Sequence, residues 1–143
     1  MHFLHLGFAI ILGVISMVHR TEASQLDELR WKNRVLVIVG PGSDAAVRRQ
    51  REIYESSADG MVERQIVLAE VIDDSERSRQ IRSALSADDK RFHVFLVGKD
   101  GRTAVSSEKP IPAEELFRRV DAMPMRRDEM RRSLSGRGAD NGI

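Results

Sequence analysis

The chain contains no cysteine. It can therefore form no disulfides or zinc–sulfur sites, and it cannot reduce peroxides through a sulfenic acid. Aromatic residues are also scarce, at 5% of 143 residues, whereas charged residues make up 31%. The core must be aliphatic, and the length suits one domain. A net charge of only +1 argues against nucleic-acid binding, which usually needs a clear basic excess.

Residues 1–23 have the pattern of a secretory signal peptide. An unbroken apolar run spans residues 6–18, and Thr21-Glu22-Ala23 follows it as a small-x-small cleavage motif. Signal peptides carry an apolar region of roughly 7–15 residues, whereas a membrane span needs about 20. We expect cleavage after Ala23 and a periplasmic or secreted protein. The alternative is an uncleaved membrane anchor, because no Lys or Arg precedes the run.

Export would also remove most of the metal-binding side chains. Three of the four histidines lie in residues 1–23, so the exported protein would keep only His93. Sites built on several His or Cys ligands are then excluded, and no EF-hand loop pattern is present. The sequence predicts neither a metal site nor another cofactor.

The rest of the chain alternates between strands and helices. Aliphatic runs at 35–39, 66–72 and 94–97 predict strands within residues 34–39, 62–72 and 92–97, the first of them buried on both faces of a sheet. Ser43 is a good N-cap, so we expect a helix from there to about Ser57, ended by Asp59-Gly60. A second helix is expected after the N-cap motif at residues 73–75.

The last elements are a hairpin and a closing helix. Gly98-Lys99-Asp100-Gly101 predicts a tight turn into a fourth strand at 103–106, because Asp-Gly supplies the positive φ that such turns need. Pro110 and Pro112 precede the closing helix, and Pro124 is expected to stop it. The predicted order is β-α-β-α-β-β-α, with the first two strands parallel and the last two antiparallel.

This order resembles the thioredoxin fold, a central mixed four-stranded sheet flanked by helices. A closer resemblance covers residues 26–130, and its motifs are Leu29–Leu36, Val97–Gly101 and Leu116–Arg126. It is to the family of domains of unknown function 4174, found in small bacterial exported proteins and in vertebrate sushi-repeat extracellular proteins.

The resemblance implies a relation to peroxiredoxins and other thiol enzymes. Thioredoxins place paired cysteines after the first strand, where this chain has Gly40-Pro41-Gly42-Ser43. They also place a proline before the third strand, where this chain has Lys90-Arg91-Phe92. Both halves of the redox site are therefore missing.

A ligand site is expected at this same end of the sheet. An antiparallel third strand begins beside the end of the first, and ligands of open α/β sheets favour such an edge near helix N-termini. The predicted pocket, suited to a small anion, consists of Gly42, Ser43, Asp73, Arg91 and His93. For each member a plain structural role is the competing interpretation.

A second candidate is the segment that follows the closing helix. Met123, Pro124, Met125 and Arg126 lead into a basic stretch, a pattern that could dock on a partner protein. The predicted domain spans residues 24–125, and residues 126–143 are expected to form a charged tail, mobile at least beyond Ser133.

The sequence thus favours an exported thioredoxin-like module without thiol chemistry that binds an envelope protein or a small anionic ligand. One alternative is a relative of thiol oxidoreductases with altered chemistry. The other is a structural envelope protein that acts through its C-terminal tail.

Overall fold

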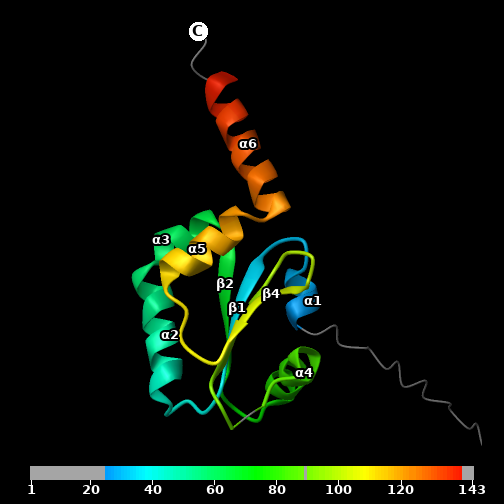
Figure 1. Cartoon of the computed structure of the whole chain (residues 1–143). Helices are drawn as coiled ribbons and strands as arrows, with labels where there is room; N and C mark the ends of the chain where they lie inside the picture. The colour runs from blue at the N-terminus through cyan, green and yellow to red at the C-terminus, as the bar shows by residue number, and fades with distance from the viewer. Residues whose placement is uncertain (1–24, 89, 140–143) are drawn as a thin grey trace, which may run out of the picture.

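The computed structural model describes residues 25–88 and 90–139 of the chain (Figure 1). It contains the predicted strands and helices, together with three further helices. In chain order the elements are α1 (Gln25–Leu29), β1 (Arg34–Val39), α2 (Ala45–Ser56), α3 (Ala58–Glu63), β2 (Ile66–Val71), α4 (Glu76–Leu85), β3 (His93–Val97), β4 (Thr103–Ser107), α5 (Ala113–Asp121) and α6 (Pro124–Ala139).

The four strands form one mixed sheet in the order β2-β1-β3-β4. As predicted, β1 pairs parallel with β2, and β3 pairs antiparallel with β4. Strands β1 and β3 are antiparallel, so Val35 lies opposite Val97 and Val39 lies opposite His93. The sheet therefore has two ends that matter here. We call the end at residues 40–43 the loop pole, and the end at Arg34 and residues 98–101 the hairpin pole.

Alternate side chains of β1 enter two separate cores, because successive residues of a strand point to opposite faces. Leu36 and Ile38 pack with α2, α3 and α5, whereas the valines at 35, 37 and 39 pack with α4 and α1. Helices thus cover both faces of the sheet (Figure 1). This α/β arrangement confirms the predicted fold class and is consistent with a thioredoxin-like fold.

Helix α2, the first helix predicted, ends near Ser57 as expected but differs from its prediction in its N-cap. Its N-cap is Asp44, whose carboxylate accepts a hydrogen bond from the Ala46 amide at 2.7 Å, and not Ser43. At the other end Asp59-Gly60 does not stop the chain but lies inside α3. Gly60 belongs there because the Phe117 ring fills the space of a side chain: a Cβ on Gly60 would lie 2.4 Å from Cζ of that ring.

The closing helix ends before Pro124, as predicted, but Pro124 then begins a further helix. Helix α5 ends at Asp121, and Pro124 occupies the first position of α6, where its missing N–H costs no hydrogen bond. The expected boundary after Met125 falls inside α6, and Arg126 is buried against the domain. The C-terminal part of α6 projects away from the rest of the domain (Figure 1).

Candidate functional site: a cationic cavity at the hairpin pole

At the loop pole, the side chains predicted to bind a ligand have other contacts. Ser43 is exposed, and its carbonyl accepts a hydrogen bond from Arg48 at 2.6 Å. Asp73 accepts hydrogen bonds from the hydroxyls of Ser78 (2.5 Å) and Ser75 (2.7 Å) and from the Ser75 amide. These bonds lower the pKa of Asp73 to about 2. The carboxylate is thus committed to the start of α4.

The start of β3 does lie beside the loop, as its antiparallel direction predicted. Gly40 has a φ of +144°, and a Cβ there would lie 3.1 Å from the Phe92 Cα, so both the backbone conformation and the close approach favour glycine. However, Arg91 is exposed and pairs with Asp88 at 3.5 Å. The His93 ring stacks on Phe95, with centroids 4.3 Å apart.

Within the described part of the chain, no hydrogen bond or ion pair joins any two of the five predicted residues. A ligand site at the loop pole therefore stays a prediction.

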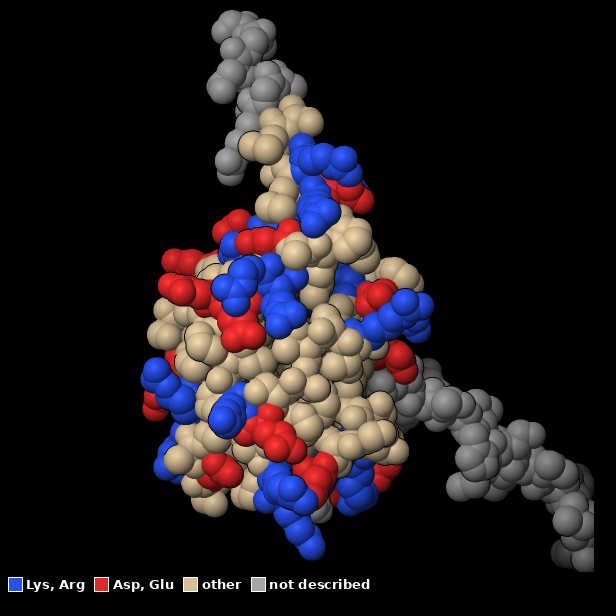
Figure 2. All heavy atoms as spheres, in the orientation of Figure 1, with Lys and Arg blue, Asp and Glu red and all other residues tan. Residues whose placement is uncertain are grey.

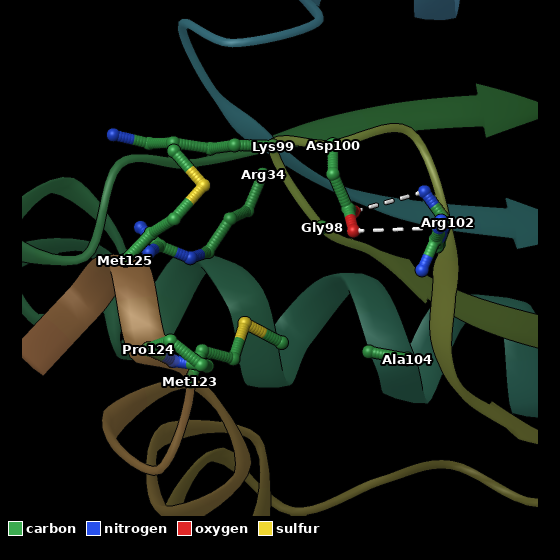
Figure 3. Close-up of a pocket in the computed structure, with 9 residues that line it drawn as sticks. All are labelled: Arg34, Gly98, Lys99, Asp100, Arg102, Ala104, Met123, Pro124 and Met125. Carbon is green, nitrogen blue, oxygen red and sulfur yellow. Dashed lines mark hydrogen bonds and ion pairs between the residues drawn. The ribbon is translucent and has the colours of Figure 1, made fainter.

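A cavity of about 320 Å³ lies at the opposite end of the sheet (Figure 3). Its walls come from the first residue of β1, from the β3–β4 hairpin and from the junction between α5 and α6. The residues that line it are Arg34, Gly98, Lys99, Asp100, Arg102, Ala104, Met123, Pro124 and Met125. Three of the four residues predicted to bind a partner, Met123, Pro124 and Met125, thus line this cavity.

Arg34 is the most deeply buried charge at the cavity, with a side chain only 1% exposed. Its Nη1 donates to the Arg64 carbonyl at 2.9 Å, and Nη1 and Nη2 each donate to one oxygen of Glu129 at 3.3 Å. Its Nε–H has no hydrogen-bond partner among the described residues. A buried donor of this kind costs free energy unless a ligand or water accepts its hydrogen bond.

Lys99 brings a second buried cation to the same carboxylate. Its Nζ donates to Glu129 at 2.6 Å and also to the side-chain oxygen of Gln65. Burial tends to raise the pKa of Glu129, but the hydrogen bonds from Lys99 and Arg34 together outweigh it, so this pKa lies below its ordinary value. Glu129 is therefore ionised at neutral pH.

The buried charges at the cavity do not balance. Two cations, Arg34 and Lys99, face one carboxylate, Glu129, which leaves one positive charge unmatched. At the rim, Arg102 lies 3.9 Å from Asp100, and these two charges cancel. In Figure 3 the Arg34 and Lys99 side chains extend toward Met125, while Asp100 and Arg102 face each other across the hairpin.

The neighbouring charges form a balanced group. Two arginines, Arg64 and Arg126, pair with two carboxylates, Asp121 and Glu63. Arg64 donates two hydrogen bonds to Asp121, at 3.0 and 2.8 Å. Arg126 donates to Glu63 at 2.7 Å. Arg126 was predicted to contact a partner. In the structure its side chain bonds to Glu63 of α3 and Asp121 of α5 and so holds α6 against both helices. It also lies 3.9 Å from Glu129, so the two groups adjoin.

The site lacks features that other ligand classes require. Within residues 25–88 and 90–139, no cluster of three His, Cys, Asp or Glu side chains could hold a metal ion. In the same residues, no helix has the length and apolar character to cross a membrane. On the face shown in Figure 2, basic and acidic side chains are interspersed. The unmatched charge in the cavity is instead suited to one small anion.

Sequence reasoning missed Arg34, Lys99 and Glu129 as site residues. A signal for the first was present, because Arg34 begins a strand whose following residues are all buried, so its charge also had to be buried and compensated. Nothing local marks Glu129 as its partner, since 95 positions separate the two.

Comparison with known proteins places this site inside a family domain. A family model described as "Domain of unknown function (DUF4174)" matches residues 25–129, which is most of the chain and ends at the carboxylate that pairs with Arg34. No curated protein and no solved structure matches the chain. The three segments on which the resemblance rested, 29–36, 97–101 and 116–126, each contribute residues to the cavity wall. The chain belongs to the DUF4174 family of domains of unknown function.

Proposed function

We propose that this protein is an exported, non-catalytic binding module whose ligand is a small anion held in the hairpin-pole cavity. The observation that carries the proposal is that Arg34 lines the cavity while its buried Nε–H has no hydrogen-bond partner among the described residues. The unmatched positive charge of Arg34 and Lys99 supports it, because buried charges in proteins are normally paired.

The absence of cysteine supports a role without thiol catalysis. The chain has no cysteine, and the segment corresponding to the thioredoxin active site carries only the turn and cap of α2. The Asp44 amide donates to the Pro41 carbonyl at 2.9 Å, and the Asp44 carboxylate caps the helix. A peroxidase or disulfide-reductase assay tests this part, and turnover above a blank would show that the alternative, an enzyme with altered chemistry, is right.

Anion binding can be tested by calorimetric titration of the purified protein with sodium acetate and sodium phosphate against sodium chloride. The decisive variant is the double substitution Arg34→Gln with Glu129→Gln, which removes both partners of the buried pair together with the free donor edge of Arg34. Lys99 keeps its charge and its hydrogen bond to Gln65, so the net charge of the site is the same as in the wild type and the variant isolates the donor edge. It should fold and bind anions much more weakly. Arg91→Gln at the loop pole is the matched control and should bind as the wild type does.

The opposite pattern would contradict the proposed site. If Arg91→Gln abolishes binding and the double variant retains it, the ligand binds at the loop pole, where the sequence alone placed it.

Export is the second component of the proposal and rests on residues 1–23, which lie outside the described residues. The apolar run and the motif ending at Ala23 support it. N-terminal sequencing of the protein from fractionated cells tests it. A chain that begins at Ser24 in the periplasm or medium is the expected result, whereas an intact N-terminus in the membrane fraction would favour the anchored alternative.

A further inference from the structure

We infer that the ligand of the hairpin-pole cavity is a planar monocarboxylate that carries a short apolar chain. This inference rests on the proposed anion-binding function and names the class of anion. Three features of the cavity lead to it: the number of unmatched charges, the shape of the free donor edge on Arg34, and the character of the walls.

The charge count favours an anion with one negative charge. Arg34 and Lys99 together carry two positive charges and Glu129 carries one negative charge. The adjoining groups, Arg64 and Arg126 with Asp121 and Glu63, and Arg102 with Asp100, are each neutral in sum. A monoanion would therefore neutralise the site, whereas a dianion such as a phosphate monoester would leave a negative charge in excess.

The free edge of Arg34 presents two parallel donors. A guanidinium has five N–H groups, and three of them are used here, two on Nη1 and one on Nη2. The remaining pair, Nε–H and the second N–H of Nη2, lie side by side along one edge of the planar group. Such an edge matches the two oxygens of a carboxylate, which it binds through two parallel hydrogen bonds.

The remaining walls suit an apolar chain. Met123, Pro124 and Met125 close one side of the cavity, and Ala104 lies on the strand that follows the hairpin (Figure 3). Methionine side chains are flexible and adapt to ligands of varied shape. A volume of about 320 Å³ lies at the small end of ligand pockets, so the chain attached to the carboxylate must be short.

Two sources can supply this chemistry. One is a free short-chain carboxylic acid, and the other is the C-terminal residue of a peptide with an apolar side chain. Both present the same planar head group and a short apolar body. The experiment therefore includes hexanoate for the first source and N-acetylleucine for the second.

The test is a calorimetric titration series with acetate, butyrate and hexanoate, which add methylene groups to a constant head group. Each buried methylene should tighten binding by about three- to fourfold. Two probes separate charge from chain: 1-hexanol carries the chain without the charge, and inorganic phosphate carries charge without the chain. Both should bind much more weakly than hexanoate. N-acetylleucine is compared with its uncharged amide in the same way.

Two surface variants locate the chain-binding wall without touching the charges. Ala104→Leu fills the cavity from an exposed position and should abolish the gain from acetate to hexanoate. Ser106→Leu makes the same kind of change at an exposed position of the same strand, outside the cavity, and should leave the series unchanged. The methyl resonances of Met123 and Met125 should shift on hexanoate binding, while that of Met61 in the closed core should not.

The outcomes separate this inference from the proposal on which it rests. If acetate and phosphate bind as tightly as hexanoate, the site binds anions but the ligand class is wrong. If no anion binds, or if the double variant of Arg34 and Glu129 binds as the wild type does, the proposed function fails and the inference fails with it. Tighter binding of hexanoate than of N-acetylleucine, or the reverse, names the source.

Discussion

Glu129 on α6 accepts a hydrogen bond from each terminal nitrogen of Arg34, the first residue of β1, which lies 95 positions earlier in the chain. The pair joins the projecting helix to the central strand of the sheet. Because Lys99 donates to the same carboxylate, the β3–β4 hairpin is tied to both. Glu129 therefore contributes both to the fixing of α6, beside Arg126, and to the electrostatics of the cavity.

The first prediction concerns Glu129→Gln, which leaves Arg34 and Lys99 without a counter-ion. We expect unfolding in urea to show a loss of about 2 kcal/mol, less than the roughly 3–5 kcal/mol of a fully buried pair, because the Glu129 side chain is 22% exposed. The proposed site predicts a second effect. Because the variant lacks the carboxylate that pairs with Arg34 and Lys99, acetate and phosphate should stabilise it more than they stabilise the wild type. Equal stabilisation of the two proteins would contradict a cationic site beside Glu129.

The second prediction concerns acid stability. Burial acts to raise the pKa of Glu129 and of Asp121, but their hydrogen bonds to Lys99, Arg34, Arg64 and Arg126 lower both pKa values below the ordinary 4.5 and 3.8. A depressed folded-state pKa stabilises the fold above the unfolded-state pKa, and this stability is lost as pH falls through the folded-state value. The free energy of unfolding should therefore fall as pH drops below about 4.5.

Urea titrations from pH 7 to pH 2.5 check the second prediction. Asp121→Asn combined with Glu129→Gln should flatten the decline. Glu108→Gln removes an exposed carboxylate and should leave the curve unchanged. An identical acid profile in the double variant would show that the two ion pairs do not contribute.

The third prediction concerns Gly60→Ala in α3. Alanine inside a helix normally stabilises it by about 0.5–1 kcal/mol relative to glycine, but here the new Cβ would meet the Phe117 ring at 2.4 Å. That ring packs under the Arg64 guanidinium, 4.3 Å away, so displacing it would cost this contact. We expect a net loss of about 1–2 kcal/mol in thermal or urea unfolding.

Two controls belong to this substitution. Gly136→Ala, on α6 with no atom within 4 Å of the new Cβ, should increase helicity instead. Adding Phe117→Leu to Gly60→Ala should recover part of the loss, and a purely additive double mutant would argue against the clash.

The fourth prediction concerns Gln50, a fully buried amide on α2. It donates to the Ile111 carbonyl at 3.1 Å and accepts from the Ile111 amide at 2.6 Å, so it pairs both polar groups of a loop residue. Gln50→Leu would leave both groups buried without partners, and we expect a loss of about 2–4 kcal/mol. Gln80→Leu removes only a bond to the exposed Glu76 and should change stability by less than about 0.5 kcal/mol.

The elements that the sequence predicted well are those with strong local signals. The run from Val35 to Val39 is apolar along its whole length and became the core of β1. The Asp100-Gly101 pair turned the hairpin, where Gly101 adopts a φ of +82°. Gln50 interrupts an apolar helical stripe, and its buried amide pairs with both backbone groups of Ile111.

Sequence reasoning failed where a local rule competed with a distant contact. Asp59-Gly60 predicts a helix stop, but the pair lies inside α3. The Phe117 ring of α5 occupies the space beside Gly60, so a residue without a side chain fits there. Pro124 reads as a stop as well, yet the same residue type begins helices readily. The basic segment after Met125 reads as a solvated tail, because nothing near it in sequence shows that Arg126 will be buried against Glu63 and Asp121.

By itself, the sequence determined the class of the protein and the chemistry that it lacks: strand and helix periodicity set the element order, and the absence of cysteine excluded thiol catalysis. Only the tertiary structure decided where an anion could bind. The charges of Arg34, Lys99 and Glu129 interact only because the fold brings β1, the hairpin and α6 together. Electrostatic pairing depends on distance and burial, and the order of residues alone specifies neither.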